Sequence, residues 1–248
     1  MSKFAVAGAT GRLGQHVVDV LAERGHHVVP MSRATGVDII TGEGLAEALT
    51  GVEVVIDVAS WHGSEQEAAT EFFRTAARNL QETGRQAGVA RIAAASIIGT
   101  DKATAGFIAA KKVHEELLLA GPLPVRLLRA AQFHEFVGQL LDWQQSDVVH
   151  LPALPTQLVA CRTVAEELVD LAMDPSDPGP PIPEIAGPRK EIMADAARIL
   201  GARRGIEVVG VDGSGMPDAD IAAAGGFLPS PHAKLAGPTF QEWLDAQS

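Results

Sequence analysis

Apolar and polar positions follow two different rhythms along the first half of the chain. Short, nearly continuous apolar runs predict strands that are buried on both faces. Between them, apolar residues recur at intervals of three and four, which predicts amphipathic helices. The predicted strands are residues 3–8, 27–31, 37–40, 52–59, 89–98 and 122–129, and the helices between them are 13–24, 44–49, 65–88 and 107–120. Strands that alternate with helices predict an α/β fold with a doubly wound parallel sheet, the Rossmann arrangement.

The pattern becomes less regular after Arg129. We predict helices over 136–145, 163–173, 190–200 and 239–246, strands over 184–187 and 206–211, and a Gly- and Pro-rich loop with one helical turn over 213–231. This change predicts a core of residues 1–133 and a smaller C-terminal part of residues 134–248. Some elements of the second part, about 157–187, are expected to return to the core.

The first strand ends in a glycine turn that points to a nucleotide. The sequence there is Gly8-Ala9-Thr10-Gly11-Arg12-Leu13-Gly14. Gly8 allows a sharp turn, Gly11 lets the backbone approach a pyrophosphate, and Gly14 lets the helix pack on the strand. The helix N-terminus offers free N–H groups to the phosphates. We therefore expect a dinucleotide here rather than a glycine turn without a ligand, and expect it to contact Gly8, Thr10, Gly11, Arg12, Leu13 and Gly14.

The end of the second strand favours NADP(H) over NAD(H). An acidic residue at this point binds the ribose 2′-OH of NAD, whereas an arginine accommodates the 2′-phosphate of NADP. Here the strand leads into Ser32 and Arg33, with no acid, and Arg12 is a second cation for the same region. Alternatively, Arg33 is a solvated loop residue. Asp38 is either a partner for the adenine amino group or a turn and capping residue.

Other candidate contacts lie where the remaining strands end, since a dinucleotide crosses the carboxyl ends of a parallel sheet. The 52–59 strand leads into Ser60 and then Trp61-His62-Gly63, a candidate wall of a substrate pocket. The residues that we expect at the cofactor from these ends are Ala59, Ser60, Ala95, Ala131 and Phe133.

Composition and charge narrow the classes of partner. The 248 residues carry a net charge of −11 and no basic run, which argues against direct nucleic-acid binding. No apolar stretch reaches membrane-spanning length. The single cysteine, Cys161, excludes an internal disulfide, and we expect no signal peptide, so a cytoplasmic location is favoured. The histidines are scattered, and we expect no metal site.

These motifs together resemble the atypical short-chain dehydrogenase/reductase proteins, in particular the NmrA-like NAD(P)-binding group. The resemblance is specific for fold and cofactor and poor for substrate. It implies a Rossmann domain with a smaller C-terminal part that binds substrate. Members include NADPH-dependent reductases, quinone reductases and NADPH-sensing regulators that have lost catalysis. The stretches that carry the resemblance are residues 8–14, 32–33, 89–99, 111–117, 128–136, 184–188 and 239–244.

The resemblance also implies catalytic positions, one of which departs from the family pattern. Many short-chain reductases use a serine at the end of the fifth strand and a Tyr-x-x-x-Lys pair on the next helix. Serine polarises the carbonyl, tyrosine donates the proton, and lysine binds the nicotinamide ribose. Ser96 and Lys111 match the serine and the lysine, but Phe107 stands where the tyrosine would be. A phenyl ring has no proton to give, and the chain contains no tyrosine at all.

Three interpretations of this departure remain open. In the first, His62, His134 or water supplies the proton, and acceptors such as quinones take theirs from solvent. In the second, the site binds NADP(H) without chemistry and acts as a redox sensor through a protein partner. In the third, Lys111 is only a solvated helix residue paired with Glu115 at i+4. For the two histidines, loop or packing roles are the alternative.

We therefore expect an NADP(H)-dependent oxidoreductase that transfers hydride to a small organic acceptor such as a quinone or a carbonyl. The alternative is a non-catalytic NADP(H)-sensing regulatory protein. The partners expected are a small-molecule substrate and, for the sensor, a regulatory protein, with no nucleic acid and no membrane.

Overall fold

The computed structural model describes residues 1–63, 65–174, 176, 179 and 181–247. Its centre is one parallel sheet, whose strands are β1 (Lys3–Ala7), β2 (His27–Met31), β3 (Val54–Asp57), β4 (Arg91–Ile97), β5 (Val125–Ala130), β8 (Glu184–Ala186) and β11 (Lys234–Leu235). The order across this seven-stranded sheet is β11-β8-β5-β4-β3-β1-β2, and every neighbouring pair is parallel. The predicted doubly wound α/β fold is confirmed.

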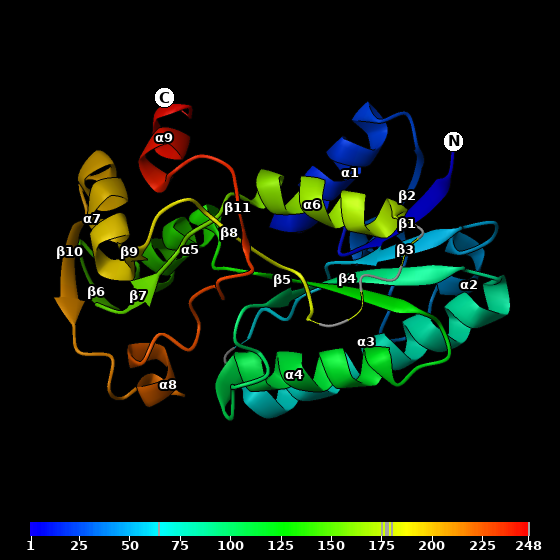
Figure 1. Ribbon diagram of the computed structural model, residues 1–248, viewed down its shortest axis with the longest axis horizontal. Helices are drawn as coiled ribbons and strands as arrows, with labels where there is room; N and C mark the ends of the chain where they lie inside the picture. The colour runs from blue at the N-terminus through cyan, green and yellow to red at the C-terminus, as the bar shows by residue number, and fades with distance from the viewer. Residues whose placement is uncertain (64, 175, 177–178, 180, 248) are drawn as a thin grey trace.

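Helices cover both faces of the sheet (Figure 1). They are α1 (Arg12–Glu23), α2 (Leu45–Ala48), α3 (Gln66–Ala87), α4 (Gly106–Leu119) and α6 (Cys161–Met173). On one face α1 and α6 bury Leu21 and Leu168 against the strands. On the other face α3 and α4 bury Leu80 and Leu118. Burying such a side chain contributes about 1.5–3 kcal/mol, so the two layers fix the strand ends that form the site.

The C-terminal part has a core of its own. It contains α5 (His134–Gln144), β6 (Val148–Pro152), β7 (Pro155–Thr156), β9 (Glu191–Ile192), α7 (Met193–Arg204), β10 (Glu207–Val211), α8 (Ala219–Ala223) and α9 (Phe240–Asp245). β6 pairs with β10 in parallel, and Leu141, Leu200 and Phe240 are buried together beside this pair. By contrast, α6 and β8 belong to the central core, and β11, which lies beyond the segment expected to return there, joins the central sheet as an exposed edge strand.

The strand predicted over 37–40 is wrong. After β2 the chain forms a short 3-10 helix, η1 (Arg33–Thr35), and then a turn. The Asp38 carboxylate accepts hydrogen bonds from the backbone N–H groups of Ile40 at 2.7 Å and Thr41 at 3.3 Å. These local bonds close a turn and compete with a ladder. The buried Val37 and Ile39 thus pack under the sheet without joining it.

The helix that we predicted over 190–200 begins at Met193 and continues to Arg204, since Glu191 and Ile192 pair with β7. Among the helices of the described part of the chain, none combines the length and the apolar character needed to cross a membrane.

Candidate nucleotide-binding and reaction site

The glycine turn between β1 and α1 is held by close backbone contacts. Gly8 has φ +80°, and a Cβ there would lie 2.8 Å from the Cα of Ala59 at the end of β3. A Cβ on Gly14 would lie 2.0 Å from the carbonyl oxygen of Gly8, so α1 rests directly on the turn. The N–H of Gly11 donates to the same carbonyl oxygen at 2.9 Å. Only glycine fits these positions without moving the backbone.

The N-terminus of α1 is open to an anion. Gly11 is its N-cap and offers no side-chain cap, and no acidic residue lies in the first turn. Thr10 is exposed and Leu13 is buried under the turn. Free N–H groups and the positive end of the helix dipole at a glycine turn suit a pyrophosphate. The residues present thus fit the phosphates of a dinucleotide.

Arg12 and Arg33 lie in different surroundings. The Arg12 guanidinium donates to Gln139 of α5, and both line a groove of about 400 Å³ with Asp142, Arg204 and other residues of the C-terminal part. Arg33 is exposed directly after β2, and within the described residues its guanidinium makes no hydrogen bond or ion pair. Of the two arginines, Arg33 is the one whose guanidinium has no partner within the described residues.

Two other residues predicted near the adenosine make local bonds. Ser32 caps η1, where its backbone N–H donates to Thr35 Oγ1 at 2.9 Å. One carboxylate oxygen of Asp38 is used in the 38–42 turn, as the capping alternative describes.

The ends of the middle strands bring together the other residues expected at the cofactor. Ala59 and Ser60 follow β3, and the Ala59 N–H donates to Asp57 Oδ1 at 3.0 Å. Ala95 lies in β4 and Ala131 directly after β5, both buried. Phe133 is half-buried and forms a bridge with Val159.

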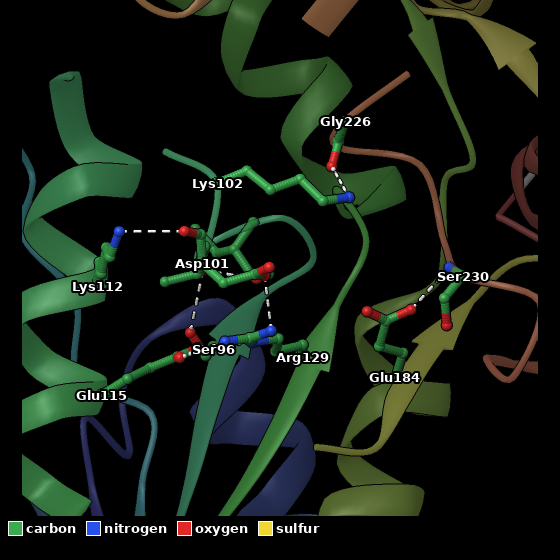
Figure 2. A network of polar contacts seen from close by, with 11 residues as sticks. Ser96, Asp101, Lys102, Lys112, Glu115, Arg129, Glu184, Gly226 and Ser230 are labelled. Carbon is green, nitrogen blue, oxygen red and sulfur yellow. Dashed lines mark hydrogen bonds and ion pairs between the residues drawn. The ribbon is translucent and has the colours of Figure 1, made fainter. Parts of the chain in front are cut away.

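Ser96 is buried near the end of β4, where its Oγ lies 3.4 Å from Thr100 Oγ1. The loop that follows is tied to the C-terminal part. Lys102 donates to the carbonyl oxygen of Gly226 at 3.1 Å, as Figure 2 shows, and Asp218 accepts from Thr104 N–H at 2.9 Å. The segment around α8 therefore positions the loop between Ser96 and α4.

Phe107 is in the first turn of α4 and belongs to an aromatic cluster. Its ring meets Phe73 of α3 edge-on, with the ring centroids 5.7 Å apart. Phe72 and Trp61 continue the cluster, so these side chains form an apolar wall. The predicted wall residue His62 is exposed next to it.

Lys111 is 6% exposed, so the interpretation of a solvated residue paired with Glu115 is wrong. Its Nζ lies 3.0 Å from Nδ1 of His114 and 4.8 Å from the centroid of the Phe73 ring. Nε2 of His114 lies 3.0 Å from Oδ2 of Asp57, which is fully buried. Glu115 instead binds Arg129 of β5 through two hydrogen bonds.

Burial and mutual contacts shift the pKa values of this buried chain. Burial lowers the pKa of Lys111, and the charges of Asp57 and Glu115 oppose that effect. Burial also lowers the pKa of His114, so its imidazole is neutral at pH 7. Burial alone would raise the pKa of Asp57, but the hydrogen bond from His114 and the charge of Lys111 outweigh it and the pKa falls. An ionised Asp57 therefore faces Lys111 Nζ through a neutral imidazole.

Asp57, His114 and Arg129 are not among the site residues that the sequence predicted. A signal for Asp57 was present, because an ionisable residue interrupts an otherwise apolar strand. His114 lies 57 positions further along the chain, and no local pattern joins the two.

His134 lies in a different environment from Ser96 and Lys111. It begins α5, its Nε2 donates to the Pro238 carbonyl oxygen at 3.1 Å, and its ring packs against Phe240 and Trp243. These contacts belong to the C-terminal core and match the packing alternative. Among the described residues, no group of His, Cys, Asp and Glu is arranged to hold a metal ion.

Comparison with known proteins agrees with this geometry. A family model described as NAD(P)H-binding matches residues 8–134. The ceramide reductase of Caulobacter vibrioides is 27% identical to this chain over an alignment of 257 residues, gaps included. The alignment covers 90% of this chain and 76% of the relative.

Two solved structures share the fold. A short-chain dehydrogenase/reductase superfamily protein of Agrobacterium tumefaciens with bound NAD has a TM-score of 0.70 and 16% identity, covering 98% of this chain and 95% of the other. The NADPH-dependent quinone oxidoreductase of Escherichia coli, complexed with NADPH, has a TM-score of 0.67 and 19% identity, covering 98% and 99%. One neighbour holds NAD and the other NADPH, so the choice of cofactor rests on the residues of this chain.

Proposed function

The chain belongs to the NAD(P)H-binding family, and from this premise we propose that it is an NADP(H)-dependent reductase of a small organic acceptor, of the short-chain dehydrogenase/reductase type. The observation that carries the proposal is the buried side chain of Lys111, on the helix that follows Ser96. Burying a lysine seldom stabilises a fold. Perturbed ionisable groups of this kind concentrate at functional sites.

The chemistry requires one hydride and one proton for each acceptor. Bound nicotinamide supplies the hydride. Lys111 orients the ribose, Ser96 donates a hydrogen bond to the acceptor oxygen, and the wall of Trp61, Phe72 and Phe107 packs against one side of the acceptor. Because Phe107 gives no proton, the reduced oxygen takes its proton from solvent. This favours quinones, whose reduced oxygens are easily protonated, over simple carbonyls.

The preference for NADP(H) over NAD(H) follows from the end of β2. Arg33 is exposed and free of partners within the described residues, so its guanidinium is available to a 2′-phosphate. Ser32 and Arg33 follow β2 directly, so no carboxylate stands at this strand end as a partner for a 2′-hydroxyl.

The test is turnover of NADPH by the purified protein with a panel of quinones, carbonyls and ceramide, followed by nicotinamide absorbance. Ceramide is included because of the Caulobacter relative. We expect oxidation of NADPH with at least one acceptor, and a loss of at least tenfold in Ser96→Ala and Lys111→Met. Lys112→Met is the matched control, since it removes the neighbouring charge on the same helix. Equal activity of Lys111→Met and Lys112→Met would contradict the proposal.

A second candidate function is supported by Phe107. A site that holds NADPH without a proton donor also suits a sensor that signals its redox state to a regulatory protein. Tight NADPH binding without turnover of any acceptor would favour the sensor. The assignment to the NmrA-like group, which includes such regulators, stays a prediction.

A further inference from the structure

Three buried polar side chains form a continuous chain of hydrogen bonds behind the proposed reaction site. Asp57 at the end of β3 is 0% exposed, His114 of α4 is 1% and Lys111 is 6%. Lys111 Nζ lies 3.0 Å from His114 Nδ1, and His114 Nε2 lies 3.0 Å from Asp57 Oδ2. Burying so many polar groups disfavours folding unless each is paired. The arrangement therefore calls for a functional explanation.

The chemistry of the three groups fixes the direction of each hydrogen bond. A lysine ammonium only donates, so Nδ1 of His114 accepts and the imidazole proton is on Nε2. That proton is donated to Asp57 Oδ2, and Asp57 Oδ1 accepts from the Ala59 N–H at 3.0 Å. Both carboxylate oxygens are thereby used. An ammonium has three N–H donors, and within the described residues Lys111 spends one of them, on His114.

This chain of hydrogen bonds leads on to the glycine turn between β1 and α1. The backbone of Ala59, which Asp57 holds, lies so close to Gly8 that a Cβ there would meet Ala59 N at 2.9 Å. The contacts thus run from Lys111 on α4 through Asp57 on β3 to the turn that would hold the pyrophosphate. This relay of Lys111, His114 and Asp57 therefore connects the lysine with the turn that would hold the pyrophosphate.

The charges around Lys111 single out Asp57 as its counter-ion. On α4 the neighbours of Lys111 are Glu115 and the neutral His114. The Glu115 carboxylate is already paired, because Arg129 of β5 donates two hydrogen bonds to it. On α3 the neighbour is the uncharged ring of Phe73. Asp57 of β3 has no arginine or lysine bonded to it in the described chain, so its charge is balanced by Lys111 through His114.

We propose that Asp57 and His114 are positioning residues that hold the Lys111 ammonium in place and keep it charged. This inference rests on the proposed function, in which Lys111 binds the nicotinamide ribose. Asp57 supplies the negative charge, and His114 transmits it as an acceptor toward Lys111 and a donor toward Asp57. Neither residue touches the cofactor or the acceptor.

The first test is the pH profile of kcat/KM for NADPH oxidation, measured for wild type and Asp57→Asn. Removing a carboxylate that favours the charged ammonium lowers the pKa of Lys111, so the alkaline limb moves to lower pH by about 1 unit or more. Glu116→Gln is the matched control, because it removes an exposed carboxylate of α4. Its alkaline limb should coincide with that of wild type. A limb that stays at the wild-type pH in Asp57→Asn would overturn the proposal.

The second test compares two replacements of His114. A glutamine amide both accepts and donates, so His114→Gln should keep kcat/KM within about threefold of wild type. His114→Leu does neither and should lose at least tenfold, with NADPH affinity falling in parallel. Equal losses in both variants would mean that the histidine only fills space. If Asp57→Asn fails to fold, this pair carries the test.

The failure of the proposed function is visible separately in the wild type. If wild type turns over no acceptor, the same comparisons are made on the dissociation constant of NADPH as a function of pH. If wild type binds neither coenzyme, the proposed function is wrong, and the imidazole ¹⁵N shifts of His114 still test the relay. A proton on Nε2 that moves or becomes shared in Asp57→Asn would support it, and a proton on Nδ1 in wild type would overturn it.

Discussion

Arg129 donates two hydrogen bonds to the carboxylate of Glu115, at 3.0 and 2.7 Å, and joins β5 to α4 (Figure 2). Its third nitrogen donates to Asp101 at 2.7 Å, in the loop between Ser96 and α4. The Glu115 side chain is 6% exposed and that of Asp101 53%. One guanidinium thus fixes both the helix that carries Lys111 and the loop that leads to it.

Replacement of Glu115 should be costly, because it leaves the Arg129 charge without its two-bond partner. We expect Glu115→Ala to lower the free energy of unfolding by about 3 kcal/mol, in the range for a broken buried pair. Asp101→Asn, which removes the exposed partner of the same guanidinium, should cost less than about 1 kcal/mol. Urea denaturation measures both. Similar losses in the two variants would show that burial does not govern this network.

Replacement of Arg33 should change cofactor preference and leave stability alone. An arginine bound to a phosphate contributes roughly 1.5–3 kcal/mol, or about 10- to 100-fold in affinity. Arg33→Ala should weaken NADPH binding by that factor and NADH binding hardly at all, as measured by fluorescence titration. Arg85→Ala, another exposed arginine, is the control. An equal loss for both coenzymes would remove the 2′-phosphate role of Arg33.

A hydroxyl at position 107 should restore a proton donor. General acid catalysis contributes about 100-fold or more, so Phe107→Tyr should raise carbonyl reduction by about 100-fold and quinone reduction much less. Phe72→Tyr adds the same hydroxyl to the same aromatic cluster and should leave both rates unchanged. Carbonyl reduction that does not respond to Phe107→Tyr would show that no carbonyl is presented at this position.

His134 should make stability depend on pH. Burial lowers its pKa, which the hydrogen bond to Pro238 only partly opposes. The unfolded chain therefore takes up a proton at a higher pH than the folded protein. Stability is complete above the ordinary histidine pKa and falls as pH drops through about 6.5, by at most about 1.4 kcal/mol per pH unit.

We expect His134→Phe to reduce the slope of unfolding free energy between pH 7 and 5, while keeping a ring against Phe240 and Trp243. Part of the slope should persist, because burial lowers the pKa of His114 as well. Replacing the exposed His232 by Phe is the control and should keep the wild-type slope. A His134→Phe slope equal to that of the control would contradict the expectation.

Local patterns predicted the features that depend on neighbours in the sequence. The turn at Gly8, Gly11 and Gly14 is a local backbone requirement, and the apolar runs gave most strands within a few residues. The strand over 37–40 failed because the Asp38 side chain closes a turn that apolar periodicity does not reveal. The function of these residues is a separate matter, which the variants above address.

Contacts between residues far apart in the sequence could not be predicted from local patterns. Asp57 meets His114 because β3 and α4 are neighbours in the fold, and no spacing along one element encodes that contact. The same holds for β11, which is too short to give a periodic pattern and exists because β8 offers it an edge. Both contacts depend on how the helices and strands are arranged in space.

The pairing of β11 with β8 determines when the edge of the sheet can be completed. Lys234 and Leu235 are synthesised after the other six strands, so the outer edge of β8 stays unpaired until the intervening residues and β11 have been made. Once in place, β11 becomes the new edge, and Lys234 forms an ion pair there with Glu167 of α6. A charged residue on an edge strand opposes further strand addition, so the last strand to be made also protects the sheet against joining a second molecule.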